Sequence, residues 1–342
     1  MRIRYIGWLA TDNLGDIAVY RALQQLFRPG VLDPAAPDPD AFMIGGGTLL
    51  FRQGAAEAAR SAADSSGSVF VFGSGAADPE FGEVLNAELW NAVLERCFFV
   101  GVRGFRTREV LQELGCRRPI EVTGDPALLL EARPAAGERE PRRIVVNICN
   151  TRHSRLWGGD NRGVRARVVE AANGLVRRGF RITFVSFESR NDSYVEAAAG
   201  QVEGADFIAG HRSLEGTMDL LGRCRLVIGE KLHAVVLAAA AGTPFIALEY
   251  RPKCRDFAES VGCGHRVLRT DTLSSEGIIA QVEEIEASYA GVRRELHARV
   301  TQWRERLRRA AADVQRHLAS GEPVPVPSNG SEAQLRTGMG LP

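Results

Sequence analysis

The chain has 342 residues, of which 45% are hydrophobic and 25% charged, and its formal net charge is +1. This composition is ordinary for a soluble globular protein, the length favours two domains, and the charge provides no overall attraction to nucleic acid or to a membrane. The longest uncharged apolar stretch, residues 232–248, is broken by Gly242 and Pro244 and is too short to span a bilayer. We therefore expect a cytoplasmic protein without a nucleic-acid partner.

The six cysteines are scattered along the chain and form no CxxC pair. This spacing is typical of neither a structural metal site nor a disulfide framework. We therefore expect buried thiols and no bound metal.

The first half of the chain alternates short apolar runs with longer amphipathic segments. The predicted strands are residues 3–7, 41–44, 69–72, 98–102 and 120–122. The predicted helices are residues 16–27, 54–64, 81–95 and 107–114. This alternation is typical of a parallel α/β sheet.

A charged, proline-containing segment at residues 131–143 is followed by a second run of the same kind. Its predicted strands are residues 144–148, 181–186, 206–208, 225–228 and 245–249, and its predicted helices are residues 165–178, 193–199, 213–223 and 232–241. We expect two tandem Rossmann-like domains with parallel sheets, residues 1–135 and 140–275, with a cleft between them. Residues 276–318 should form amphipathic helices, and residues 319–342 have the composition of a disordered tail.

The most informative stretch of the sequence is residues 225–253. A short apolar strand turns at Gly229 into an alanine-rich helix, whose start carries Lys231 and His233. Lys231 is a point charge suited to phosphate or carboxylate, and His233 can supply a proton near neutral pH. A helix N-terminus beside these cations favours an anion. The alternatives are a histidine that only packs at the helix start and, for Lys253 after the next strand, a solvated surface lysine.

Polar residues follow the first predicted strand, at the position where a dinucleotide-binding protein carries GxGxxG. That fingerprint is absent, so a dinucleotide is not favoured. Asn13 and Asp16 could instead bind sugar hydroxyls, and Asp16 could accept a proton from one of them. Asp16 could equally be an acidic residue that only offsets the helix dipole.

Two further strand ends carry candidate residues for binding an acceptor. Gly46 and Gly47 belong to a glycine triplet that would let a ligand approach the backbone closely, unless it is only a tight turn. Arg103 ends the fourth strand and could hold a phosphate of the acceptor, unless it is an ordinary surface arginine.

These residues, in this order and spacing, resemble the polysaccharide pyruvyl transferase family over roughly residues 3–262. The matching positions are Asn13, Gly15, Asp16, residues 45–47, Val102, Arg103, residues 111–115, residues 123–126, residues 232–234, Gly242, Pro244, Tyr250 and Lys253. The resemblance implies a fold like that of GT-B glycosyltransferases. It also implies phosphoenolpyruvate as co-substrate with no further cofactor, and a glycan or lipid-linked sugar of the cell envelope as acceptor. The products would be a pyruvate ketal and phosphate.

The resemblance also assigns roles to individual residues. The Arg-Leu-His motif of the family binds the donor, and its histidine, here His233, is the proposed general acid. The expected donor-binding residues, in the second domain, are Lys231, Leu232, Asn150, Arg152 and Lys253. The expected acceptor-binding residues are Asn13, Gly15, Gly46, Gly47 and Arg103, with Asp16 as the base. Two positions depart from the family pattern, because Lys231 replaces the motif's arginine and Arg152 is the nearest arginine after the first strand of the second domain.

Two other functions are compatible with this sequence. One is a GT-B-like glycosyltransferase that uses a nucleotide sugar, for which Glu249 is the one candidate to bind a ribose. The other is a non-catalytic protein that binds sugars or phosphates. A lipid-linked acceptor, or docking of the C-terminal helices, would bring the protein to the inner face of the membrane.

Overall fold

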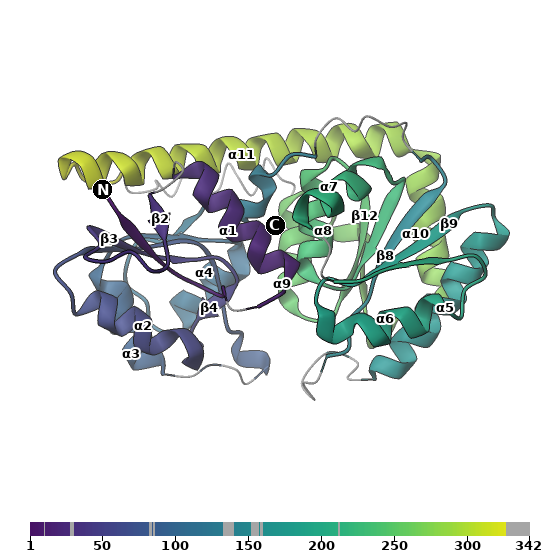
Figure 1. Cartoon of the computed structure of the whole chain (residues 1–342), viewed down its shortest axis with the longest axis horizontal. Coiled ribbons are helices and arrows are strands. Elements are labelled where there is room, and N and C mark those ends of the chain that lie inside the picture. Colours follow the sequence, from purple (N-terminus) through teal and green to yellow (C-terminus); the bar gives the residue numbers. More distant parts are fainter. Residues whose placement is uncertain are drawn as a thin grey trace. The chain divides into compact units, whose positions relative to one another are not determined.

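The computed structural model describes residues 1–9, 11–27, 31–81, 84, 86–132, 140–151, 157, 160–210 and 213–325. The chain divides into two compact units (Figure 1). Unit 1 comprises Met1–Thr11, Ala18–Leu129 and Gln302–Pro342, and unit 2 comprises Asp12–Ile17 and Leu130–Thr301. The short segment Asp12–Ile17 therefore counts with the second unit, although it follows the first strand of the first.

Unit 1 is built on a parallel sheet of seven strands in the order β2-β1-β3-β5-β6-β7, with β4 pairing to β5. The strands are β1 (Ile3–Ile6), β2 (Leu32–Asp33), β3 (Ala41–Gly45), β4 (Thr48–Leu50), β5 (Ser68–Ala76), β6 (Cys97–Val102) and β7 (Glu121–Val122). The central strands β3 and β5 are buried along almost their whole length, as expected for a parallel sheet covered on both faces.

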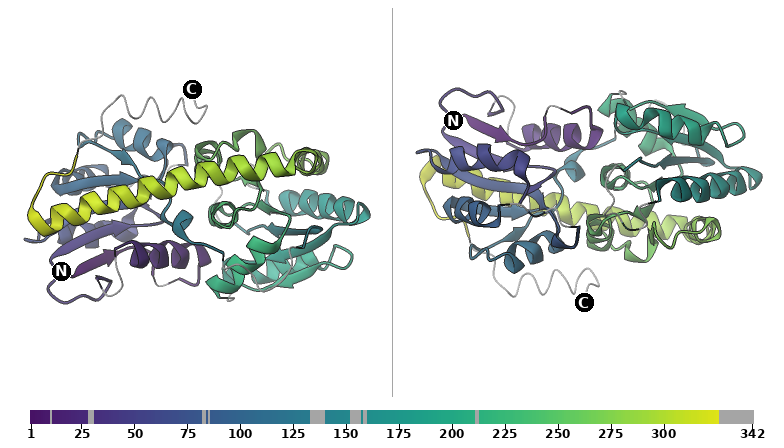
Figure 2. Two further views of the ribbon diagram at one scale, coloured as in Figure 1. Left: turned by 90° about the horizontal axis from the view of Figure 1, so that it is seen from above. Right: turned by 90° about the horizontal axis from the view of Figure 1, so that it is seen from below.

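The helices of unit 1 connect these strands. They are α1 (Leu14–Leu26), α2 (Gln53–Ala63), α3 (Ala87–Arg96) and α4 (Phe105–Glu113), with short 3₁₀ turns η1 (Pro79–Phe81) and η2 (Pro126–Leu129). The end of the long helix α11 (Tyr289–Ser320) also belongs to unit 1, where Trp303 is fully buried. Figure 2 shows α11 as one continuous helix.

Unit 2 contains a parallel sheet of six strands in the order β10-β9-β8-β11-β12-β13. The strands are β8 (Arg143–Asn147), β9 (Arg181–Val185), β10 (Asp206–Ile208), β11 (Leu226–Gly229), β12 (Phe245–Glu249) and β13 (Val267–Arg269). Numbered within the unit, this is the order 3-2-1-4-5-6 of a Rossmann sheet. The chain therefore reverses its direction of winding between the neighbouring strands β8 and β11.

The helices of unit 2 are α5 (Asn161–Arg177), α6 (Asp192–Ala199), α7 (Leu214–Arg223), α8 (Leu232–Ala240), α9 (Pro252–Ser260), α10 (Ser275–Ala287) and the start of α11, with 3₁₀ turns η3 (Ser189–Asn191) and η4 (Gly264–Arg266). Side chains of α5, α6 and α10 pack on one face of the sheet and form a continuous apolar core with it. Polar side chains cap the starts of α5, α7 and α10, where Asp160, Ser213 and Ser274 each accept a bond from a backbone N–H in the first turn.

The fold class predicted from the sequence, two α/β units with parallel sheets, is confirmed. Every predicted strand is present, and β2, β4 and β13 are additional short strands. The helix predicted at residues 81–95 begins only at Ala87, and Pro252–Ser260, where no helix was predicted, forms α9. The segment expected to be a tail extends into residues 326–342, which lie outside the described residues.

Among the described residues, no helix is long and apolar enough to cross a membrane.

Candidate active site in unit 2

The candidate site lies at the carboxyl ends of β8 and β11, where the winding of the unit 2 sheet reverses. In open α/β sheets, ligands bind outside the strand ends at this switch point. Strand β8 ends at Asn147, and Asn150 lies in the segment that follows it. Strand β11 ends at Gly229 and is followed by Glu230 and by Lys231, which precedes α8. The sequence therefore brings its candidate donor-binding residues to the place where this fold binds ligands.

The buried side chain of Asn147 joins the strand ends together. Its amide nitrogen donates to the carbonyl of Val185 (2.8 Å), and its amide oxygen accepts from the backbone N–H of Lys231 (3.0 Å). The carbonyl of Asn147 also accepts from the N–H of Glu230 (2.9 Å). Asn147 thereby fixes the backbone of Lys231 against β8 and β9.

Lys231 is the N-cap residue of α8, one position before the first helical turn in which the sequence placed it. Its ammonium nitrogen lies 2.9 Å from Oε1 of Glu188, and its side chain is only 16% exposed. The sequence predicted that Lys231 binds an anionic donor, and in the structure its charge is paired with a carboxylate of the chain itself.

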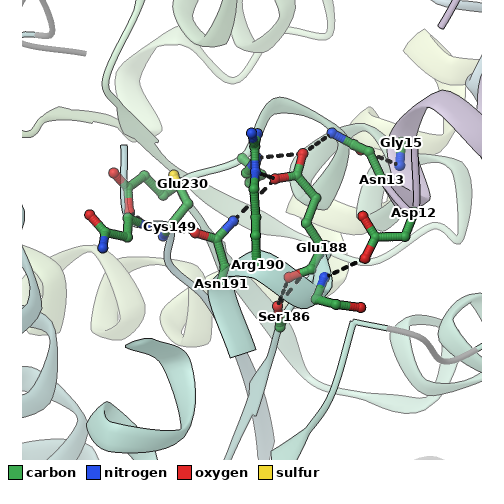
Figure 3. Close-up of polar contacts among 12 residues, drawn as sticks. Asp12, Asn13, Gly15, Cys149, Ser186, Glu188, Arg190, Asn191 and Glu230 are labelled. Atoms are coloured by element: carbon green, nitrogen blue, oxygen red, sulfur yellow. Dashed lines mark hydrogen bonds and ion pairs between the residues drawn. The ribbon is translucent and has the colours of Figure 1, made fainter. Parts of the chain in front are cut away.

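Glu188 lies in the segment between β9 and α6, and its buried carboxylate accepts bonds from three residues besides Lys231 (Figure 3). Asn13 donates to Oε1, while the Arg190 guanidinium (2.5 Å) and the Asn191 amide (3.2 Å) donate to Oε2. Burial by itself would raise the pKa of Glu188, but the charge of Lys231 and the bonds from Arg190 and Lys231 outweigh it, so the pKa is lowered. Glu188 is therefore a carboxylate at neutral pH.

The segment before α1 is attached to this cluster by further hydrogen bonds. The N–H of Leu14 donates to the carbonyl of Phe187 (2.9 Å), and the N–H of Ser189 donates to Oδ2 of Asp12 (2.8 Å). Together with the bond from Asn13 to Glu188, these contacts explain why residues 12–17 count with unit 2.

Gly15, at the start of α1, lies against His233, the candidate general acid. Its N–H donates to Oδ1 of Asn13 (2.9 Å), so that Asn13 caps the start of α1 (Figure 3). A Cβ built on Gly15 would lie 2.2 Å from Nδ1 of His233. Only glycine lets the backbone approach the imidazole this closely. Asp16 follows in the first turn of α1 and is partly buried.

Glu230 is a second buried carboxyl group, directly beside Lys231 in the chain. Its Oε2 accepts from the backbone N–H of Cys149 at 2.8 Å, which attaches the segment after β8 to the end of β11. Burial raises the pKa of Glu230 to about 7. Burial, reinforced by the charge of Glu230, also raises the pKa of the Cys149 thiol well above its usual range. The thiol is therefore protonated at neutral pH and is no nucleophile.

The remaining donor-side candidates lie around these strand ends. Asn150 is exposed, its N–H donates to Oδ1 of Asn191 (3.0 Å), and its Oδ1 accepts from Asn161 (3.1 Å). Lys253 is in the first turn of α9, with its ammonium 5.1 Å from the ring centroid of Tyr250. Leu232 is buried at the first position of α8. Arg152 lies outside the described residues.

The acceptor-side candidates Gly46, Gly47 and Arg103 belong to unit 1. Both glycines are buried and have positive φ angles, and a Cβ on Gly46 would lie 2.5 Å from Cγ1 of Val19. Arg103 is 8% exposed, and its Nε lies 3.9 Å from a carboxylate oxygen of the buried Asp125. These contacts give the residues a structural role in their own unit, whatever they bind.

The structure bears on two other expectations. Among the described residues, no group of three or more His, Cys, Asp or Glu side chains could hold a metal ion. Glu249, the candidate for binding the ribose of a nucleotide sugar, is fully buried, and Arg255 donates to both of its carboxylate oxygens (2.8–3.2 Å).

Sequence reasoning missed Glu188, Asn147 and Glu230. Each stands at or just after the end of a predicted strand, which was the only available signal. Their importance comes from contacts across long chain separations, such as 175 residues between Asn13 and Glu188.

Comparison with known proteins identifies the family of this chain. The sequence profile described as "Polysaccharide pyruvyl transferase" matches residues 13–252, a segment that begins at Asn13 and includes Glu188, Lys231 and His233. A weaker relative is the amylovoran biosynthesis protein AmsJ of Erwinia amylovora, 24% identical over 152 residues. The match covers 42% of this chain and 37% of that protein, so the chain spans little more than a third of its relative.

Several solved structures have the same fold as this chain. The S. aureus MnaA–UDP structure has a TM-score of 0.62 at 12% identity, covering 93% of this chain and 96% of that one. A putative UDP-N-acetylglucosamine 2-epimerase of Listeria monocytogenes has a TM-score of 0.60 at 15% identity, covering 91% and 82%. The trehalose-6-phosphate synthase OtsA has a TM-score of 0.51 at 14% identity, covering 90% and 76%. At these identities the likeness shows the fold alone, which is of the GT-B type.

Proposed function

Because this chain belongs to the polysaccharide pyruvyl transferase family, we propose that it transfers the enolpyruvyl group of phosphoenolpyruvate to a sugar of a cell-surface glycan or its precursor. The products are a pyruvate ketal and phosphate. The observation that carries the proposal is the pairing of a cation and an imidazole at one helix start, with Lys231 as N-cap of α8 and His233 in its first turn.

The donor is a small molecule with a phosphate and a carboxylate, so its site must offer positive charge. Lys231 and Arg190 both pair with Glu188, so two cations share this one carboxylate. A helix N-terminus adds a favourable electrostatic contribution for an anion. In our proposal, Lys231 and the start of α8 bind the donor, together with Lys253, Asn150 and Arg152.

The proposed reaction begins with proton transfer. His233 donates a proton to the methylene carbon of phosphoenolpyruvate, which becomes a methyl group, and positive charge develops at the carbon that carries the phosphate. A hydroxyl of the sugar attacks this carbon, and Asp16 accepts the hydroxyl proton. The carbon–oxygen bond to phosphate then breaks, and a second hydroxyl of the same sugar closes the ketal. Of the two hydroxyl protons, one replaces that given by the histidine and the other leaves with phosphate.

The position of His233 supports its role as the acid. The imidazole contacts the backbone of Gly15 and belongs to the first turn of a buried helix, so its orientation is constrained from two sides. A general acid must be held within hydrogen-bonding distance of the atom it protonates, and such constraint reduces the entropy lost on reaching that geometry.

The test is donor-dependent ketal formation. The protein is incubated with phosphoenolpyruvate and a panel of p-nitrophenyl hexosides, and phosphate release and acceptor mass are measured. We expect one acceptor to gain the mass of pyruvate less one water, with equimolar phosphate. Parallel reactions with UDP- and GDP-sugars test the glycosyltransferase alternative. Hexosyl transfer from these donors, with none from phosphoenolpyruvate, would contradict the proposal. The bidentate pairing of Glu249 with Arg255 disfavours this alternative.

A further inference from the structure

We propose that Glu188 is the positioning residue of this active site, because it holds the donor-binding Lys231 and the acid His233 in one fixed arrangement. It acts on Lys231 directly and on His233 through Asn13 and Gly15. This inference rests on the proposed function, since it assigns a purpose to the arrangement of these two residues.

The direct contact is the ion pair between Glu188 and Lys231. The two charged atoms are 2.9 Å apart, and the side chains are 4% and 16% exposed. Arg190 and Asn191 donate to the other carboxylate oxygen, so Glu188 is held from both sides. A lysine ammonium on a flexible stem needs such a partner, because it lacks the planar fork that orients an arginine. Glu188 thus compensates for the lysine that replaces the arginine of the family motif.

The indirect contact runs through the start of α1. Asn13 donates to Oε1 of Glu188 with its amide nitrogen and accepts from the N–H of Gly15 with its amide oxygen. Gly15 in turn contacts the imidazole of His233. A displacement of Glu188 therefore moves both the ammonium of Lys231 and the backbone of Gly15, which contacts the imidazole of His233.

A glutamine at position 188 cannot replace this carboxylate. Four donor groups converge on the two oxygens of Glu188, whereas an amide offers one oxygen and turns an NH₂ group toward other donors. In Glu188→Gln, the new NH₂ group therefore points at two of these donors, which lose their acceptor. The substitution also removes the negative charge that pairs with Lys231. We expect the turnover number per folded enzyme to fall by about 10²-fold, the loss typical of a small misplacement of catalytic groups.

Asn13→Asp is the complementary variant. Aspartate caps a helix as well as asparagine does, so the bond from Gly15 is kept. The new carboxylate faces that of Glu188, however, and we expect a similar fall in turnover. The double variant N13D/E188Q exchanges amide and carboxylate across the same hydrogen bond and restores the total charge of the cluster. We expect its turnover number to exceed that of either single variant by about tenfold, the non-additivity of residues in direct contact.

The experiment combines steady-state kinetics with NMR of the histidine ring. The chain has six histidines, and H233Q assigns the ¹H–¹³C ring signal of His233. We expect this signal to move in E188Q and in N13D and to return toward the wild-type position in the double variant. Glu196→Gln removes an exposed carboxylate in α6 and serves as the matched control, with unchanged turnover and signal.

The inference is overturned if the His233 signal is unchanged in both single variants, or if their effects simply add in the double variant. It is also overturned if the variants differ from wild type in unfolding free energy but not in turnover per folded enzyme. The ring signal needs no substrate. An absence of turnover with phosphoenolpyruvate in every variant, wild type included, would therefore refute the proposed function while the NMR result still decides the role of Glu188.

Discussion

The backbone of Gly15 lies against the imidazole of His233, so closely that a Cβ at position 15 would be 2.2 Å from Nδ1. These residues are more than two hundred positions apart in the chain. Their contact joins the start of α1 to the start of α8, and it makes the orientation of the proposed acid depend on a turn near the N-terminus.

Gly15→Ala tests this dependence. A methyl group would overlap the ring, so the imidazole must move away from its position in the wild type. We expect the turnover number with phosphoenolpyruvate to fall by about 10²-fold, with donor binding, measured by titration calorimetry, largely kept.

Gly291→Ala is the control for this variant, because a Cβ there meets nothing within 4 Å. It lies inside α11 and should raise helix stability slightly while turnover stays unchanged. Wild-type turnover in the Gly15→Ala variant would show that the contact with His233 does not orient the acid.

Lys231→Met removes the ammonium but keeps a side chain of similar length. Glu188 then loses one of the two cations with which it pairs in a largely buried cluster. The donor-binding site also loses a positive charge. We expect the Kd for phosphoenolpyruvate to rise at least tenfold and the free energy of unfolding to fall by about 2 kcal/mol. Calorimetry and urea denaturation measure these two quantities.

Lys231→Arg is the matched variant and restores the residue of the family motif. It keeps the charge and adds a planar fork, so donor binding should be retained. If arginine weakens binding as much as methionine does, the site is built around the ammonium and the charge alone does not explain donor binding. If the methionine variant binds phosphoenolpyruvate normally, Lys231 does not bind the donor.

Glu230→Gln tests the buried carboxyl group beside Lys231. Burial raises the pKa of Glu230 to about 7 in the folded protein, above the ordinary value of 4.5. Between these pH values the folded state binds more protons than the unfolded state, so stability from this group is present below pH 4.5 and is lost as the pH rises through 7. We expect the unfolding free energy of wild type relative to Glu230→Gln to decrease by about 3 kcal/mol from pH 4.5 to pH 8.

Urea denaturation of both proteins across this range measures the difference, in which the contributions of all other groups cancel. A difference that does not change with pH would show that folding leaves the pKa of Glu230 unchanged, and a difference that increases with pH would show that folding lowers it. Either result would contradict a pKa raised by burial.

Much of the fold could be predicted because it depends on local patterns. Short apolar runs such as residues 144–148 and 245–249 predict buried strands, and their alternation with helices predicts parallel sheets. Helix α9 was not predicted, although Pro252 stands at its start, where proline favours the first position of a helix.

The candidate site was predicted only in part. The short interval between Lys231 and His233 places both at one helix start, and this could be deduced from spacing. The partner of Lys231 could not be deduced, because Glu188 lies in a distant segment after β9 and its place just after a predicted strand was its only local signal. The assignment of Asn13 to an acceptor did not foresee that its side chain would donate to Glu188. Such contacts depend on how the chain folds and not on a motif.

His233→Gln in deuterated water tests the central claim most directly. If phosphoenolpyruvate is the donor and its methylene carbon is protonated by the enzyme, the ketal formed by the wild type carries a methyl group with one deuterium, detectable by NMR and mass spectrometry. The variant should bind phosphoenolpyruvate but form this product at least about 10²-fold more slowly. Product without deuterium in the methyl group, or wild-type rates in the His233→Gln variant, would contradict the account.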